Sequence, residues 1–222
     1  MKQLPAAVPQ RGVSLPRRER VQVFRKQLIL EAAEEVFAAH GFDGASIEEI
    51  ARRAEIAIAT LYKIFGSKEA VFTALVEHRQ DQFLVEVESF ARESADPRVQ
   101  IERLVAAIFR YFEEHQHAFR IYLGATHGFP WHIRSSFGER TFQKYQEFLK
   151  FLAALLQAGI DTGAWARTNP QRLAAAVMGC INGLLTQRHT EQPQLHLTDD
   201  IAFATGVVSR LVGGPTRSGR RK

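Results

Sequence analysis

Residues 46–68, SIEEIARRAEIAIATLYKIFGSK, decide the fold of the N-terminal part of the chain. Ser46 and Glu49 predict a capping box, in which each side chain accepts a hydrogen bond from the other residue's backbone N–H at a helix start. A break near residues 55–57 separates this helix from a second one, which Gly66 ends. Two short helices joined in this way are typical of a helix-turn-helix, whose second helix enters the DNA major groove. Apolar residues recur at helical spacing and predict the inward faces, at Ile47, Ile50, Ala51, Ala54, Ile58, Leu61 and Phe65.

The residues around this stretch follow a longer pattern with fixed spacings. It reads I-L-x-A-A-x-x-V-F-x-x-x-G over residues 29–41, S-x-x-x-I-A over 46–51 and T-L-Y-x-x-F-x-S-K-E over 60–69. With this pattern, residues 25–77 resemble the N-terminal domain of the TetR family of transcriptional regulators. The resemblance implies a three-helix DNA-binding unit in a homodimer that binds a palindromic operator.

Four positions depart from the family pattern. Glu55 replaces the glycine of the turn, Ala57 the serine that caps the second helix, Ala59 an inner glycine, and Ile64 the His or Tyr before Phe65. A non-glycine residue in a left-handed turn costs about 1 kcal/mol, and a missing N-cap costs about as much. We therefore expect the unit to fold, and the departures to change which bases are read.

The resemblance also assigns DNA contacts residue by residue. Ile58, Ala59 and the methyl group of Thr60 cannot form bidentate hydrogen bonds, so we expect readout of thymine methyl groups, with Lys63 reaching guanine. Arg25 and Lys26 lie in a basic segment that we expect to contact phosphate or the minor groove. The implied phosphate contacts are Ser46, Thr60, Tyr62 and Lys68, and the implied base contacts are Ala57, Ile58, Ala59 and Lys63.

The net charge of +5 is concentrated at the two ends of the 222-residue chain. Residues 1–26 hold seven Lys and Arg against one acidic residue, and residues 217–222 hold four more. The remaining residues carry 18 basic and 23 acidic side chains, so the body of the chain is mildly acidic. This distribution favours a polyanionic partner. Cys180 is the single cysteine, and no apolar run is long enough for a membrane span or signal peptide, so we expect a cytoplasmic protein without disulfides.

Helical periodicity continues to the C-terminal end, and we expect an all-α protein of about nine helices. Ser67 caps a long helix to about residue 93, which connects the DNA-binding unit to the following helices. An irregular aromatic loop is expected over residues 127–138, and Thr198 is expected to cap the last helix. The expected divisions are a flexible basic arm (1–21), the helix-turn-helix domain (22–82), a helical ligand-binding and dimerisation domain (83–212) and a basic tail (213–222).

Eleven aromatic residues between residues 109 and 148 predict an apolar cavity for an apolar or aromatic ligand. Small residues near residue 180 predict a close helix–helix contact between two subunits. The expected ligand contacts are Phe109, Phe112, Tyr122, Trp131 and Phe148. The expected dimer contacts are Val177, Cys180, Gly183, Leu184, Ala204 and Val208.

The favoured function is a homodimeric repressor that a small molecule releases from a palindromic operator. One alternative is a helix-turn-helix regulator controlled by a protein partner, and another is a helical small-molecule-binding protein or enzyme. The sequence contains no catalytic or nucleotide-binding motif, and its histidines match no zinc signature. We therefore expect no enzyme activity, no cofactor and no metal site.

Overall fold

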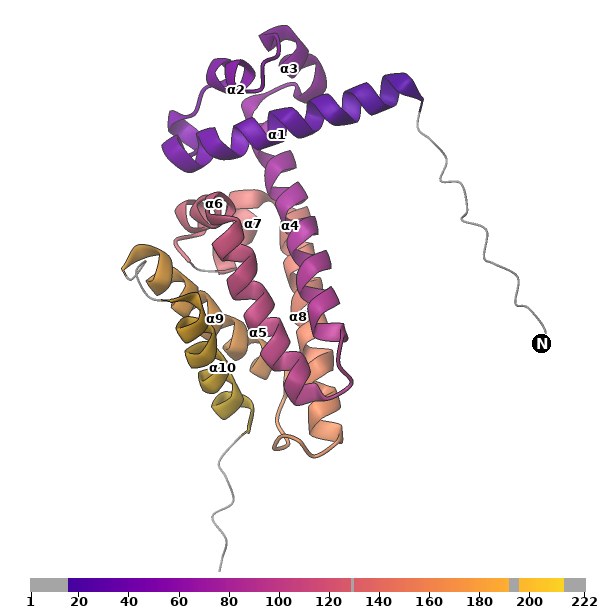
Figure 1. The fold of residues 1–222 in the computed structure, drawn as a ribbon, viewed down its shortest axis with the longest axis vertical. Helices are drawn as coiled ribbons and strands as arrows, with labels where there is room; N and C mark the ends of the chain where they lie inside the picture. Colours follow the sequence, from indigo (N-terminus) through magenta and orange to yellow (C-terminus); the bar gives the residue numbers. More distant parts are fainter. Residues whose placement is uncertain (1–15, 129, 192–195, 214–222) are drawn as a thin grey trace, which may run out of the picture.

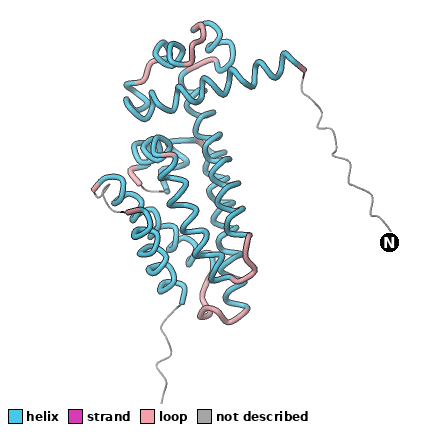
Figure 2. Tube along the Cα trace, viewed as in Figure 1, coloured by secondary structure: helices cyan, strands magenta, loops and turns pink. Residues whose placement is uncertain are grey.

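The computed structural model describes residues 16–128, 130–191 and 196–213. All regular structure in these residues is helical, which confirms the predicted all-α class (Figure 2). The described residues form ten α-helices and one 3₁₀-helix. The tail beyond residue 213 and most of the basic arm lie outside the described residues.

Three helices form the N-terminal unit at one end of the molecule (Figure 1). They are α1 (Arg17–Gly44), α2 (Ile47–Arg53) and α3 (Ile58–Phe65). The long helix α4 (Lys68–Arg92) runs from this unit into the C-terminal half, as predicted. Ser67 is its N-cap and accepts a hydrogen bond from Ala70 N at 3.2 Å.

The C-terminal half is a helical bundle around α4 and α5. Helix α8 packs against α4, α5 and α9, and α10 packs against α5 and α9 (Figure 1). The bounds are α5 (Pro97–Glu114), α6 (Gln116–Thr126), η1 (Pro130–His132), α7 (Ile133–Phe137), α8 (Glu139–Asp161), α9 (Pro170–Thr190) and α10 (Leu197–Gly213).

Two hydrophobic cores stabilise the fold. The N-terminal core contains the inward faces of α1, α2, α3 and the first part of α4, and it also contains Ile121 of α6 and Phe137 of α7. The C-terminal core contains the inward faces of α5, α8, α9 and α10 with the second part of α4. Helix α4 therefore contributes to both cores, through Leu75 in the first and Val87 in the second.

Some helix boundaries differ from the predictions. Helix α1 begins at Arg17, so part of the expected arm is helical, and its helical geometry is interrupted at Gly41, where φ is +68°. The expected loop over residues 127–138 contains η1 and α7, because Ile133 and Phe137 are buried in the N-terminal core. Thr198 is not the cap of α10, since the first helical N–H groups donate to His196 O.

The predicted capping box of α2 is only half formed. Ser46 Oγ accepts a hydrogen bond from Glu49 N at 3.1 Å, as expected. The Glu49 carboxylate instead accepts from Arg53 Nε at 3.2 Å, one helical turn further on. An arginine at i+4 competes successfully here because it offers a charge-assisted bond.

Candidate nucleic-acid interface and internal cavity

The turn before α3 has the strained backbone that the sequence predicted. Glu55 has a φ of +53°, in the left-handed region where the family pattern has glycine. Ala57 is the N-cap of α3 and provides no side-chain hydrogen bond. Leu61, which is fully buried, anchors α3 in the N-terminal core and fixes which face points outward.

The exposed face of α3 carries the predicted base contacts. Ala57, Ile58, Ala59 and Lys63 are all exposed. The prediction that Ile58 also belongs to the inward face was wrong, since its side chain is 41% exposed in the first turn of α3. This face is therefore apolar at its start and basic near its end.

The predicted phosphate contacts differ in their exposure and in the hydrogen bonds that they already make within the protein. Tyr62 is 47% exposed, and Thr60 is half-buried beside it. The half-buried Lys68 ammonium donates hydrogen bonds to Ala45 O at 3.2 Å and Asp43 O at 3.4 Å, and it lies over the ring of Phe42. Lys68 therefore holds the α1–α2 connection in place, a structural contact that the sequence did not indicate.

Helix α1 carries Arg25 and Lys26, two of the basic residues expected to contact DNA. Arg25 and Lys26 are both exposed. The Lys26 ammonium lies 5.7 Å from the centre of the Phe65 ring at the end of α3. The amino-terminal part of α1 extends beyond α2 and α3 (Figure 1) and carries Arg17, Arg18 and Arg20.

A cavity of about 140 Å³, partly open to the surface, lies between the two hydrophobic cores. Its walls come from α4, α5, α6, α7, α8 and α9. Leu75, Ile121 and Phe137 line it from the N-terminal core, whereas Phe83, Ile108 and Met178 line it from the C-terminal core. Anything that fills the cavity therefore contacts both cores at once.

The structure brings three of the five predicted ligand contacts together. Phe112, Tyr122 and Phe148 line the cavity. Phe109 does not, because it faces the C-terminal core and is 1% exposed. The side chain of Trp131 lies outside the described part of the structure.

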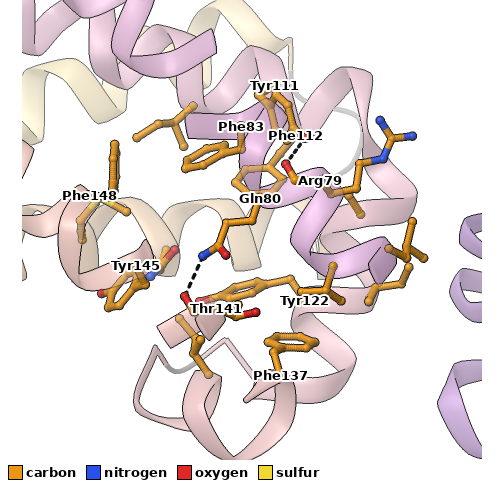
Figure 3. Close-up of a pocket in the computed structure, with 18 residues that line it drawn as sticks. Arg79, Gln80, Phe83, Tyr111, Phe112, Tyr122, Phe137, Thr141, Tyr145 and Phe148 are labelled. Atoms are coloured by element: carbon orange, nitrogen blue, oxygen red, sulfur yellow. Dashed lines mark hydrogen bonds between the residues drawn. The ribbon is translucent and has the colours of Figure 1, made fainter. Parts of the chain in front are cut away.

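The cavity also has polar lining residues that sequence reasoning missed. They are Arg79 and Gln80 on α4, Thr141 on α8 and Asn182 on α9 (Figure 3). The spacing of apolar residues gave no signal for these positions, because each polar side chain lies within a largely apolar helix face.

The Arg79 guanidinium is engaged by the N-terminal unit. Its Nε donates to both carboxylate oxygens of Glu34 at 3.0 Å, and its Nη1 donates to Gln82 Oε1 at 2.7 Å. Glu34 lies on α1 and is 5% exposed. A buried ion pair therefore joins α1 to the wall of the cavity.

The tyrosines of the cavity remain neutral. Burial raises the pKa of Tyr145 to about 12, and burial also raises the pKa of Tyr122 and Tyr111. The Tyr111 hydroxyl donates to Arg79 O at 2.9 Å (Figure 3). The aromatic wall is thus uncharged at physiological pH.

Comparisons with known proteins agree with this architecture. Residues 29–75 match the family model described as bacterial regulatory proteins, tetR family. The transcriptional activator FasR of Mycolicibacterium smegmatis is 34% identical over 117 residues, which are 53% of this chain and 51% of FasR. The transcriptional repressor NicS of Pseudomonas putida is 37% identical over 87 residues, 39% of this chain and 41% of NicS.

The solved structures extend the likeness over nearly the whole chain. The fatty acid degradation regulator FadR from Bacillus halodurans superposes with a TM-score of 0.74 over 87% of this chain and 96% of that protein, at 20% identity. Residues 29–75 form a helix-turn-helix domain of the TetR family. TetR proteins are DNA-binding transcriptional regulators and not enzymes. The sequence matches to FasR and NicS span about half or less of those relatives.

The outer face of α9 and α10 corrects part of the expected TetR dimer surface. Val177, Ala204 and Val208 are fully buried within a single chain and cannot contact a second subunit. Gly183 is exposed, and Cys180 and Leu184 are half-buried, with burial raising the pKa of the Cys180 thiol. Helix α10 adds Phe203, 59% exposed, and Leu211, 41% exposed, which the sequence analysis did not select.

Two classes of site are absent from the described residues. They contain no group of three or more His, Cys, Asp or Glu side chains that could hold a metal ion. No described helix combines the length and the apolar character needed to cross a membrane.

Proposed function

We propose that this TetR-family chain acts as a homodimeric repressor that leaves a palindromic operator when an apolar or aromatic small molecule fills the cavity. The observation that carries the proposal is the position of the cavity between the two cores, against the helix that both cores share. The proposed function has three parts: DNA contact through α3, dimer formation through α9 and α10, and ligand-induced release of DNA through α4.

The exposed face of α3 supports DNA contact. Its position beside basic side chains of α1 suits a helix that enters the major groove while its neighbours contact phosphate. Ile58 and Ala59 would read thymine methyl groups, and Lys63 would reach guanine. The DNA phosphates would be bound by Arg25, Lys26, Ser46, Thr60 and Tyr62. Lys68 would contact a phosphate as well as hold the α1–α2 connection in place.

The outer face of α9 and α10 supports pairing. Exposed glycines on α9 allow close helix approach, and exposed Phe203 and Leu211 on α10 offer apolar area. A two-fold interface of this kind uses the same surface on both subunits. Pairing also supplies the second recognition helix that a palindrome requires.

Release would follow from the contact between the cavity and the middle of α4. The cavity touches α4 from Leu75 to Phe83, in the middle of the helix. Packed helices shift between discrete arrangements, so a ligand here would change the spacing of two recognition helices held about 34 Å apart.

An acyl compound is a specific alternative ligand. FadR from Bacillus halodurans is named as a regulator of fatty acid degradation. The mainly apolar lining of the cavity suits an acyl chain. A long chain needs more room than the present cavity, since an engineered cavity of about 150 Å³ holds one benzene.

The experiment is selection of bound duplexes from random DNA, followed by affinity measurement on the selected site. We expect an inverted repeat with half-site centres about one helical turn apart. Gly183→Arg should give monomers that no longer bind the repeat, while Gly124→Arg, at an exposed glycine of α6, should leave binding unchanged. Selected sites without two-fold symmetry, or a monomeric wild-type protein at micromolar concentration, would contradict the proposal.

A second measurement tests release. A ligand that weakens operator binding must bind more weakly to the operator complex by the same factor, typically about 5- to 150-fold. Equal ligand affinities with and without operator would show that the cavity is not coupled to DNA binding.

A further inference from the structure

Two polar side chains face each other across the cavity without satisfying each other. Gln80 Nε2 on α4 donates to the backbone carbonyl of Thr141 on α8 at 2.9 Å (Figure 3). Because a carbonyl oxygen only accepts, this bond fixes which end of the Gln80 amide is oxygen. The bond leaves Gln80 Oε1 and the hydroxyl of Thr141 for another partner.

Neither of these two atoms has a hydrogen-bond partner among the described residues. Gln80 Oε1 and Thr141 Oγ1 are both buried and unsatisfied, and the Thr141 residue is only 4% exposed. Folded proteins leave few buried polar atoms unpaired, because the lost hydration is not recovered. An acceptor and a hydroxyl that both line one cavity are therefore a ready site for a molecule with its own donor and acceptor.

The charge of the lining restricts what that molecule is. Arg79 is the only Lys, Arg or His among the lining residues, and its guanidinium is already paired with Glu34 of α1. Burial keeps the hydroxyls of Tyr122 and Tyr145 protonated. An ionised carboxylate would enter this site without a counter-charge, which is costly in an apolar environment.

The size of the cavity gives a further restriction. Its volume of about 140 Å³ is close to that of an engineered cavity that holds one benzene molecule. Aromatic side chains form much of the wall, including Phe83, Phe112, Phe137 and Phe148. Ring–ring contacts at the edge or offset face favour an aromatic guest over a saturated one of equal size.

We propose that the cavity recognises a neutral, single-ring compound that carries a hydroxyl or amide group. The group donates a hydrogen bond to Gln80 Oε1 and accepts one from the Thr141 hydroxyl, while the ring packs among the phenylalanines. This inference names the chemistry of the effector and so rests on the proposed ligand-controlled function. Its test uses direct binding to the DNA-free protein, so it can fail while operator binding and dimerisation succeed.

The experiment compares 4-methylphenol with 1,4-dimethylbenzene, which has the same shape but a methyl group in place of the hydroxyl. Affinities are measured by calorimetric titration, with octanoate as an anionic third probe. We expect 4-methylphenol to bind about tenfold more tightly than 1,4-dimethylbenzene, which corresponds to one or two net hydrogen bonds. Octanoate should bind more weakly than 4-methylphenol.

Two variants assign the preference to the proposed atoms. Thr141→Val and Gln80→Met should each reduce the ratio of the two affinities, and the double variant should bring it to about one. Thr141→Val should also raise the melting temperature of the ligand-free protein, since it removes a buried hydroxyl without a partner. Thr162→Val is the matched control, because its hydroxyl lies just after the same helix and already bonds to Ala158 O.

Each remaining outcome overturns the proposal. Equal affinity for the two methylated rings means that the polar pair holds only water. A preference that survives the double variant means that another group recognises the hydroxyl. Tighter binding of octanoate means that the site selects an anion, and failure of every probe to bind means that the cavity is a packing defect.

Discussion

Helix α3 and the cavity differ in where their side chains point and in how many helices supply them. The residues expected to contact bases lie on one helix, within residues 57–63, and point into solvent. The cavity residues come from six helices between Leu75 and Asn182 and point inward. A surface built by one helix is encoded in a short motif, whereas an internal site exists only after distant segments pack together.

The N-terminal unit that contains α3 is joined to the wall of the cavity by the ion pair between Glu34 of α1 and Arg79 of α4. Glu34→Ala would leave the mostly buried guanidinium without a counter-charge, which costs roughly 3–5 kcal/mol. We expect the melting temperature to fall by about 10 °C, since each kcal/mol corresponds to about 2–4 °C in a chain of this size. This is the largest effect that we predict.

A neighbouring glutamate provides the control. Glu35 pairs with Arg53 at the surface, where both side chains are well exposed, so Glu35→Ala should cost less than about 1 kcal/mol. Replacing both members of the buried pair with Met should restore most of the stability. A melting temperature for Glu34→Ala that matches Glu35→Ala would show that the two regions are joined by apolar packing alone.

Gly159 on α8 tests the C-terminal core separately. A Cβ atom at this position would lie 1.8 Å from Cζ3 of the buried Trp165 ring, so Gly159→Ala should cost about 1–3 kcal/mol through overpacking. Amide hydrogen exchange should accelerate in α8 and remain unchanged in α2 and α3.

Gly124 on α6 is the matched control for this substitution. Nothing lies within 4 Å of a Cβ added there, so Gly124→Ala should stabilise by about 0.5–1 kcal/mol through helix propensity. Faster exchange in α2 and α3 of the Gly159 variant would mean that the two cores unfold as one unit.

The smallest predicted effect concerns His78 on α4, beside the shared ion pair. Burial and the nearby Arg79 lower the pKa of His78, while Asp81 and Glu34 oppose the change. The unfolded chain therefore binds a proton more readily, and stability should fall as the pH drops below about 6.5. His78→Gln should reduce this loss when melting temperatures are compared between pH 7.5 and pH 5.0. An identical pH dependence in both proteins would show that His78 is protonated equally in the folded and unfolded states.

The helices and their order followed from the sequence because their signals are local. Ser46 and Ser67 cap their helices with side-chain hydrogen bonds where the sequence placed helix starts. Glu55 adopts the left-handed turn that the family pattern assigns to glycine. Helix α7 was missed because five residues carry too little periodicity to predict a helix.

Tertiary structure alone decided which side chains share a site. Periodicity marks Val177, Ala204 and Val208 as apolar, but only packing shows that they face their own chain and not a second subunit. It marks Phe109 and Phe112 as equivalent, yet only Phe112 reaches the cavity. The contacts of Glu34, Arg79, Gln80 and Thr141 depend on the relative rotation of α1, α4 and α8. That rotation is set by long-range packing of whole helix faces, so the sequence determined the helices, and the packing between them determined the cavity.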